Sequence, residues 1–126
     1  MIKTVLVVED ESPLANMYKI AFELKNIEVD IASDGASAIA KVLRFKPDLV
    51  LLDIMMPKVN GFEFLQAIRK NSSLQPQIVV NSNLEQKDDE QTATDLGANF
   101  YLRKSKYTAR EIVSKVENYN ETGKWQ

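Results

Sequence analysis

Three acidic residues lie directly after apolar stretches, at two distant points of the sequence. Glu9 and Asp10 follow the stretch 4–8, and Asp53 follows the stretch 49–52. Short, branched apolar stretches of this kind predict strands that are buried on both faces of a parallel sheet. Because parallel strands end at the same edge of an open α/β sheet, we expect the three carboxylates to lie together there. Their mutual repulsion would raise a pKa or recruit a cation.

Two more polar side chains follow predicted strands of the same sheet. Ser82 comes after the strand predicted over 77–81, and Lys104 after the one predicted over 99–103. A hydroxyl and an ammonium group beside clustered carboxylates form a set that can bind a phosphoryl group. Taken singly, these residues are also typical of turns and surfaces. The prediction therefore depends on their occurring together at successive strand ends.

Composition excludes several other kinds of site. The 126 residues contain no cysteine and no histidine, which excludes disulfides, thiol catalysis, histidine bases and most transition-metal sites. Oxygen ligands remain, and in this setting they favour Mg²⁺. The net charge of −2 does not indicate a nucleic-acid-binding surface. The apolar stretches are far shorter than the ~20 residues of a membrane helix, and acids come too early for a signal peptide. We therefore expect a cytoplasmic protein.

Five predicted strands alternate with five predicted helices, which is typical of a parallel sheet covered by helices on both faces. Ser12 is a preferred N-cap and Pro13 suits a first turn, so they predict the start of the first helix. Thr108 and Glu111 have the spacing of a capping box and predict the start of the last helix. The residues of the first helix that should face the sheet recur at helical spacing: Leu14, Met17, Tyr18, Ala21 and Leu24.

Two segments in the second half of the chain are predicted to be held less firmly than the rest. The helix expected over 85–96 is strongly polar, so few core contacts should hold it, and Gly97 suits its C-terminal cap. Residues 1–120 are expected to form the domain. Residues 121–126 lack periodicity and are expected to fray, and Trp125 among them has no assignable role.

Three motifs occur in the order and spacing of one protein family: VLVVEDE, LDIMMPKVNGFEFL and GANFYLRK. Through them the chain from Lys3 to about Tyr119 resembles the receiver domain of bacterial two-component response regulators. The resemblance implies a flavodoxin-like α/β fold with a five-stranded parallel sheet in the order 2-1-3-4-5. It also implies a switch that accepts a phosphoryl group on Asp53. Because the chain has no histidine, the donor would be a separate histidine kinase or histidine phosphotransfer protein.

The resemblance also implies a role for each residue of the predicted site. The implied ligands of Mg²⁺ are Glu9, Asp10, the carboxylate of Asp53 and the backbone carbonyl of Met55. The implied catalytic residues are Asp53, Ser82 and Lys104. Ser82 would move as a switch hydroxyl and Tyr101 would rotate inward, so that the fourth helix, fifth strand and fifth helix present a changed surface to a downstream protein. Such a regulator phosphorylates and dephosphorylates itself rather than acting as a metabolic enzyme, and no organic cofactor, nucleic acid or membrane is expected to bind it.

The sequence departs from the family pattern at three places. Ser105 stands where the family usually has a proline after the lysine, often in a cis peptide, and we expect the Lys104–Ser105 bond to be trans because a cis bond to a non-proline residue is costly. Asn83 replaces a small residue and is expected to crowd the approach to Asp53. Met55 and Leu84 are apolar and cannot orient an attacking water, which predicts a long-lived phosphoryl group.

Other functions fit the sequence less well. An inactive receiver that serves as a phosphorylation-independent binding module is the main alternative, and Asn83 and Ser105 favour it. A hydrolase with an aspartyl-phosphate intermediate generally needs a second acid two residues after the nucleophile, where Met55 stands. A flavodoxin-like electron carrier would need a phosphate-binding loop after the first strand, and fold class alone does not support that function.

Overall fold

One parallel sheet organises the chain, and its strands lie in the order β2-β1-β3-β4-β5. The computed structural model describes residues 1–56, 60–71, 73–83 and 87–126. Within these residues the strands are β1 (Thr4–Val8), β2 (Glu28–Ala32), β3 (Leu49–Leu52), β4 (Gln77–Ser82) and β5 (Phe100–Arg103). The helices are α1 (Ser12–Glu23), α2 (Gly35–Phe45), α3 (Gly61–Lys70), α4 (Lys87–Asp95) and α5 (Ala109–Thr122), with a short 3₁₀ turn η1 (Lys104–Lys106). The predicted flavodoxin-like fold class and strand order are confirmed.

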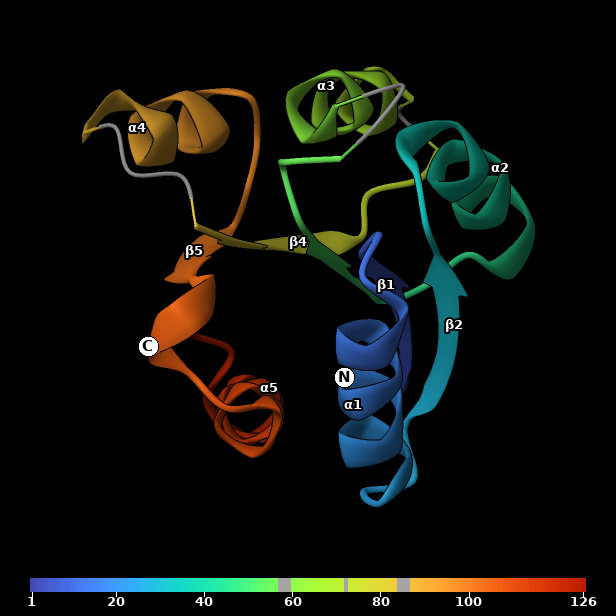
Figure 1. Cartoon of the computed structure of the whole chain (residues 1–126), viewed down its shortest axis with the longest axis vertical. Coiled ribbons are helices and arrows are strands. Elements are labelled where there is room, and N and C mark those ends of the chain that lie inside the picture. Colours follow the sequence, from blue (N-terminus) through green and yellow to red (C-terminus); the bar gives the residue numbers. More distant parts are fainter. Residues whose placement is uncertain (57–59, 72, 84–86) are drawn as a thin grey trace.

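Helices cover both faces of the sheet, as Figure 1 shows: α1 and α5 lie on one face, and α2, α3 and α4 on the other. Successive strand side chains point to opposite faces. Along β1, Val5 and Val7 accordingly join the core under α1 and α5, whereas Leu6 and Val8 join the core under the other three helices. All four residues of β3 are buried, as expected for a central strand without a solvent face.

The predicted N-terminal cap is present in the last helix, α5, but not in the first helix, α1. Thr108 Oγ1 accepts a hydrogen bond from the Glu111 N–H at 3.1 Å, and the Glu111 carboxylate accepts one from the Thr108 N–H at 2.9 Å. The predicted capping box of α5 is therefore confirmed. In α1, by contrast, Glu11 is the N-cap and Ser12 is already helical, so the expected Ser12 cap is wrong.

The buried face of α1 is rotated from the one expected. Tyr18 is buried as predicted, but Met17 and Leu24 are 57% and 76% exposed. Ala15 and Phe22 carry the buried face with Tyr18. Apolar residues surround most of this helix, so spacing alone left more than one face possible.

The polar α4 is held mainly by its C-terminal half. Ala93 is fully buried, and Leu96 beyond the end of the helix is partly buried. Gly97 follows with a φ of +108°, and its N–H donates to the Thr94 carbonyl, which fits the expected cap. Residues 84–86, where the helix was expected to begin, lie outside the described residues.

The last residues of the chain, which were expected to fray, contact the rest of the domain in the structure. Helix α5 continues to Thr122 and ends at Gly123 with a φ of +75°. The Trp125 ring stacks on that of Tyr119, with ring centroids 4.3 Å apart. Among the described helices, none has the length and apolar character needed to cross a membrane.

Candidate functional site

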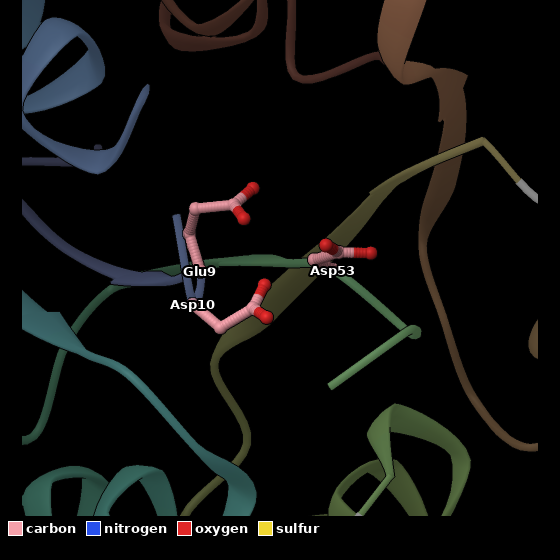
Figure 2. A group of neighbouring side chains, drawn as sticks. All are labelled: Glu9, Asp10 and Asp53. Atoms are coloured by element: carbon pink, nitrogen blue, oxygen red, sulfur yellow. The ribbon is translucent and has the colours of Figure 1, made fainter. Parts of the chain in front are cut away.

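Three carboxylates converge where β1 and β3 end, as Figure 2 shows. Glu9 and Asp10 follow β1, Asp53 follows β3, and each contributes an oxygen within 4.8 Å of the others. Glu9 and Asp53 are buried, with 2% and 5% exposure, whereas Asp10 is open to solvent. The predicted acids lie together because β1 and β3 are neighbouring parallel strands, with Val8 paired to Leu52, so the residues after both strands share one edge of the sheet.

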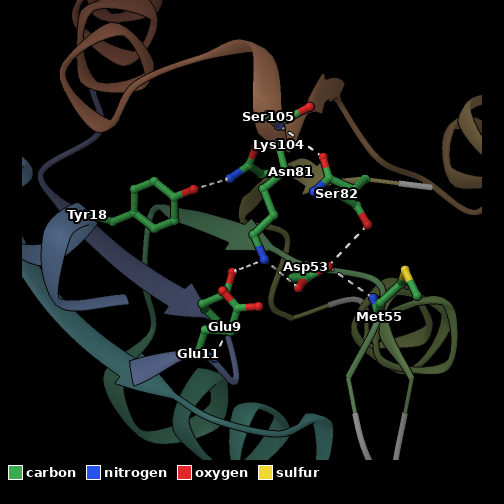
Figure 3. A network of polar contacts seen from close by, with 10 residues as sticks. Glu9, Glu11, Tyr18, Asp53, Met55, Asn81, Ser82, Lys104 and Ser105 are labelled. Atoms are coloured by element: carbon green, nitrogen blue, oxygen red, sulfur yellow. Dashed lines mark hydrogen bonds and ion pairs between the residues drawn. The ribbon is translucent and has the colours of Figure 1, made fainter. Parts of the chain in front are cut away.

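Lys104 bridges two of these carboxylates. Its Nζ lies 2.7 Å from Glu9 Oε1 and 3.0 Å from Asp53 Oδ2. The Lys104 side chain is only 11% exposed, so the positive charge is enclosed between two buried negative ones (Figure 3). The residue occupies this place because β5 ends beside β4 and η1 starts directly at Lys104.

The second Asp53 oxygen is held by two hydrogen bonds. Asp53 Oδ1 accepts one from the Ser82 hydroxyl at 3.1 Å and one from the Met55 N–H at 3.0 Å. Ser82 is completely buried at the end of β4. Both carboxylate oxygens therefore have partners, and the Asp53 side chain is fixed in one orientation at the edge of the sheet.

Burial and charge act in opposite directions on the titrating groups of the site. Burial raises the pKa of Glu9, and the hydrogen bond from Lys104 opposes this only in part. For Lys104, burial lowers the pKa, but the hydrogen bonds and negative charges of Glu9 and Asp53 outweigh it, so the pKa lies above its ordinary value. Lys104 is accordingly charged throughout the physiological pH range.

The acidic cluster fits a small divalent cation. Oxygen ligands lie at about 2.1 Å from a Mg²⁺ ion, so two ligands of one ion are at most about 4.2 Å apart. One carboxylate oxygen from each of Glu9, Asp10 and Asp53 lies within 4.8 Å of the other two, so small side-chain rotations would place all three within reach of one ion. The Asp10 carboxylate is exposed and the donors are all oxygens, which is the ligand set that Mg²⁺ prefers.

The loop after β5 contacts Asn83. The Lys104–Ser105 bond is trans, as expected, since the described residues contain no cis peptide. The Asn83 side chain accepts a hydrogen bond from the Ser105 N–H at 3.0 Å, so the two unusual residues are partners. This contact was missed from the sequence, and crowding by Asn83 stays a prediction. Leu84 lies outside the described residues.

A buried polar pair beside the site was also missed. Asn81 Nδ2 donates to the Tyr18 hydroxyl at 2.9 Å, which ties the end of β4 to α1. Burial raises the pKa of Tyr18. The signal in the sequence was an asparagine directly after the apolar residues of β4, a position where a polar side chain needs a partner.

Tyr101, the expected mobile aromatic, is half-buried against the core under α4. Its hydroxyl is buried and has no hydrogen-bond partner among the described residues. Inward rotation of Tyr101 stays a prediction.

The sequence matches the family model of the response regulator receiver domain over residues 5–117. The chain belongs to this family. It is 34% identical over 112 residues to the transcriptional regulatory protein TrcR of Mycobacterium tuberculosis, covering 89% of this chain and 43% of that protein. It is 32% identical over 117 residues to the alkaline phosphatase synthesis transcriptional regulatory protein PhoP of Bacillus subtilis, covering 93% and 48%. The receiver domain thus spans about half the length of these curated relatives.

Solved receiver domains have the same architecture. The receiver domain of the Francisella response regulator 1452 superimposes with a TM-score of 0.85 at 25% identity, covering 97% of this chain and 99% of that one. The signal receiver domain from Bermanella marisrubri gives a TM-score of 0.83 at 30% identity, covering 94% and 98%. Receiver domains belong to two-component signal transduction, are phosphorylated by histidine kinases and bind Mg²⁺ at an acidic pocket. In this chain Glu9, Asp10 and Asp53 form an acidic cluster at the corresponding edge of the sheet.

Proposed function

We propose that this receiver domain is a phosphorylation-operated switch with Asp53 as the phosphoacceptor. The observation that carries the proposal is the setting of the Asp53 carboxylate. It is buried, it bonds the Lys104 ammonium and the Ser82 hydroxyl, and it lies beside two further carboxylates. An aspartate that only caps a turn is not expected to have a buried lysine and two further carboxylates around it.

The chain's own residues supply the nucleophile and part of the charge compensation. An Asp53 oxygen forms a bond to phosphorus while the phosphorus–nitrogen bond of a phosphohistidine donor breaks, and the departing imidazole keeps the electron pair. The donor is on another protein, a histidine kinase or a histidine phosphotransfer protein, because this chain has no histidine. Lys104, with its ammonium 3.0 Å from Asp53, neutralises charge on the transferred oxygens.

The residues that would hold Mg²⁺ are Glu9, Asp10, the carboxylate of Asp53 and the backbone carbonyl of Met55. When bound, the ion would supply positive charge for the phosphoryl oxygens in the transition state. Glu9 is already fixed for this task, because its second oxygen accepts a hydrogen bond from the Glu11 N–H at 3.1 Å.

The product is proposed to act through the α4-β5-α5 surface. An aspartyl phosphate carries about −2 charge and strong acceptor oxygens. The Ser82 hydroxyl then leaves Asp53 Oδ1 for a phosphoryl oxygen, and Tyr101 rotates into the space behind it. The sparse anchoring of α4, in which Ala93 is the one buried residue among the described side chains, suits an element with two arrangements. A downstream protein, rather than nucleic acid or a membrane, reads this surface in the cytoplasm.

The phosphoryl group is expected to be long-lived. Met55 is two residues after Asp53, and its side chain is 60% exposed and apolar. It can shield the phosphoryl group but cannot orient a water for attack. A half-life of seconds for the phosphorylated domain would contradict this part of the proposal.

The proposal is tested by backbone amide signals recorded with and without Mg²⁺ and beryllofluoride, a mimic of the phosphoryl group. We expect the signals at the ends of β3 and β4 and along α4, β5 and α5 to shift. Asp53→Asn is the control that should not respond to beryllofluoride. If the wild-type signals do not respond either, the chain is the alternative, a binding module that works without phosphorylation.

A further inference from the structure

The last residues of the sequence fold back onto α5 and β5. The Trp125 ring stacks on Tyr119 of α5 at 4.3 Å and on Phe100 of β5 at 5.8 Å between ring centroids. Its indole N–H donates to Gln77 Oε1 at 2.9 Å, at the start of β4. One side chain therefore contacts three elements, and the most distant contact, with Gln77, spans 48 positions in the sequence.

Lys115 fixes the residue that follows Trp125. Its ammonium donates to the backbone oxygen of Gln126 at 3.1 Å and lies over the Tyr107 ring, 4.8 Å from the centroid. The C-terminal end accordingly lies beside the connection between β5 and α5 (Figure 1). Gln126 forms one wall of a surface pocket of about 300 Å³ whose other lining residues are Tyr107, Glu111, Ser114, Lys115 and Asn118. This pocket belongs to the surface on which α5 and the end of β5 would meet a downstream protein.

A short, continuous series of contacts joins this segment to the phosphoacceptor. Lys104 bonds Asp53 and begins η1, and η1 leads directly into Tyr107. Tyr107 contacts the Lys115 ammonium, which holds Gln126. A change in the partners of Lys104 can therefore displace Tyr107, and with it the Lys115 ammonium that holds Gln126.

We propose that residues 123–126 form a releasable strap that holds β5 and α5 in their unphosphorylated arrangement and covers part of the output surface. The inference deepens the proposed function, on which it rests. Phosphorylation of Asp53 draws Lys104 toward the phosphoryl oxygens, the Tyr107–Lys115 contact loosens, and the strap detaches from α5 and β5. In the resting state this chain's own Trp125–Gln126 segment lies against Phe100, Tyr119 and Lys115.

The contacts that hold the strap are few enough for phosphorylation of Asp53 to release it. The strap is held by two ring stacks and by hydrogen bonds that include those to Gln77 and from Lys115, and the Lys115–Gln126 hydrogen bond is exposed to solvent. Couplings between sites within proteins typically change affinity by about 5- to 150-fold, and they act in both directions. If phosphorylation releases the strap, loss of the strap must favour the phosphorylated state by the same factor.

Trp125 is the one tryptophan of the chain, so its fluorescence reports on the strap directly. We expect addition of Mg²⁺ and beryllofluoride to shift its emission to longer wavelength and to make it more accessible to acrylamide, with no change in Asp53→Asn. Shifted amide signals around Asp53 without a change at Trp125 would overturn the strap and leave the proposed function standing. If neither responds, the proposed function fails and the strap falls with it.

A second experiment measures the coupling from the other side. Trp125→Ala should raise the apparent affinity for beryllofluoride about fivefold or more, the low end of typical couplings. Gln77→Ala, which removes only the indole's acceptor, should act in the same direction and more weakly. Leu24→Ala, at an exposed apolar residue on α1, is the matched control and should leave the affinity unchanged. Unchanged affinity in both strap variants, with urea unfolding showing that they are folded, would overturn the inference.

Discussion

Replacing Lys104 by methionine tests the electrostatics of the site most sharply. The change keeps the length and apolar stem of the side chain and removes the charge that lies 2.7 Å from Glu9 Oε1 and 3.0 Å from Asp53 Oδ2. The Glu9 and Asp53 side chains are 2% and 6% exposed, so water cannot easily replace the lost ammonium.

The expected size of the effect follows from this burial. Exposed ion pairs contribute about 0–1 kcal/mol, whereas removing one partner of a buried pair typically costs about 3–5 kcal/mol. Asp10 beside the pair is exposed to solvent, so water can partly reach the Glu9 and Asp53 carboxylates. We therefore expect the free energy of unfolding to fall by about 3 kcal/mol, the low end of that range, at neutral pH without divalent cations.

The loss should depend on pH in a defined direction. Burial raises the folded-state pKa of Glu9 above its unfolded value, so its contribution to stability is complete below the unfolded pKa and is lost as pH rises through the folded pKa. Lys104 is one of the groups that lower the Glu9 pKa, so its removal raises that pKa further. Lys104→Met should therefore cost less stability at pH 5 than at pH 7.5.

Urea unfolding at both pH values measures the effect, and Glu9→Gln provides the double-mutant cycle. The Glu9→Gln/Lys104→Met protein should recover part of the stability that Lys104→Met loses, because no unpaired buried charge remains at position 9. A loss below 1 kcal/mol, or the same loss at pH 5 and pH 7.5, would refute the reasoning that Lys104 compensates buried carboxylates.

Three further changes have expected outcomes. Gly97→Ala should destabilise the domain by about 2–3 kcal/mol, and Gly123→Ala by only about 1 kcal/mol. Both glycines have a positive φ, but only the Cβ at position 97 would lie 2.7 Å from a neighbouring arginine side chain. Equal losses of unfolding free energy in urea would contradict this. Thr108→Ala should lower the free energy of unfolding by about 1 kcal/mol, because the α5 cap is lost. The control Ser114→Ala, at an exposed position within α5, should lower it by almost nothing. A Thr108→Ala protein as stable as the wild type would be evidence against the capping box. Asn83→Ala should speed labelling by a small phosphodonor, and an unchanged rate would count against crowding by this side chain.

The convergence of the predicted site could be read from the sequence because it follows from sheet geometry. Once 4–8 and 49–52 are parallel strands, the residues after them must share an edge, and Asp53 meets Glu9 whatever the details of packing. The capping box at Thr108 was equally predictable, because it depends on side chains three residues apart.

Features that depend on distant contacts could not be read in this way. Tyr18 bonds Asn81 across 63 positions, and Trp125 bonds Gln77 across 48, and no local pattern indicates either pair. The predicted buried face of α1 was wrong for a different reason. Apolar residues such as Met17 lie on more than one side of the helix, so the choice of buried face is made by packing against the sheet.

Chemical localisation of the phosphoryl group tests the central claim most directly. The protein is incubated with Mg²⁺ and a small phosphodonor, the acyl phosphate is reduced with borohydride, and peptides are analysed by mass spectrometry. We expect one modified residue, Asp53, with labelling lost in Asp53→Asn and kept in Asp48→Asn, an exposed aspartate just before β3. Stoichiometric labelling of the Asp53→Asn protein, or modification at another residue in the wild type, would contradict it.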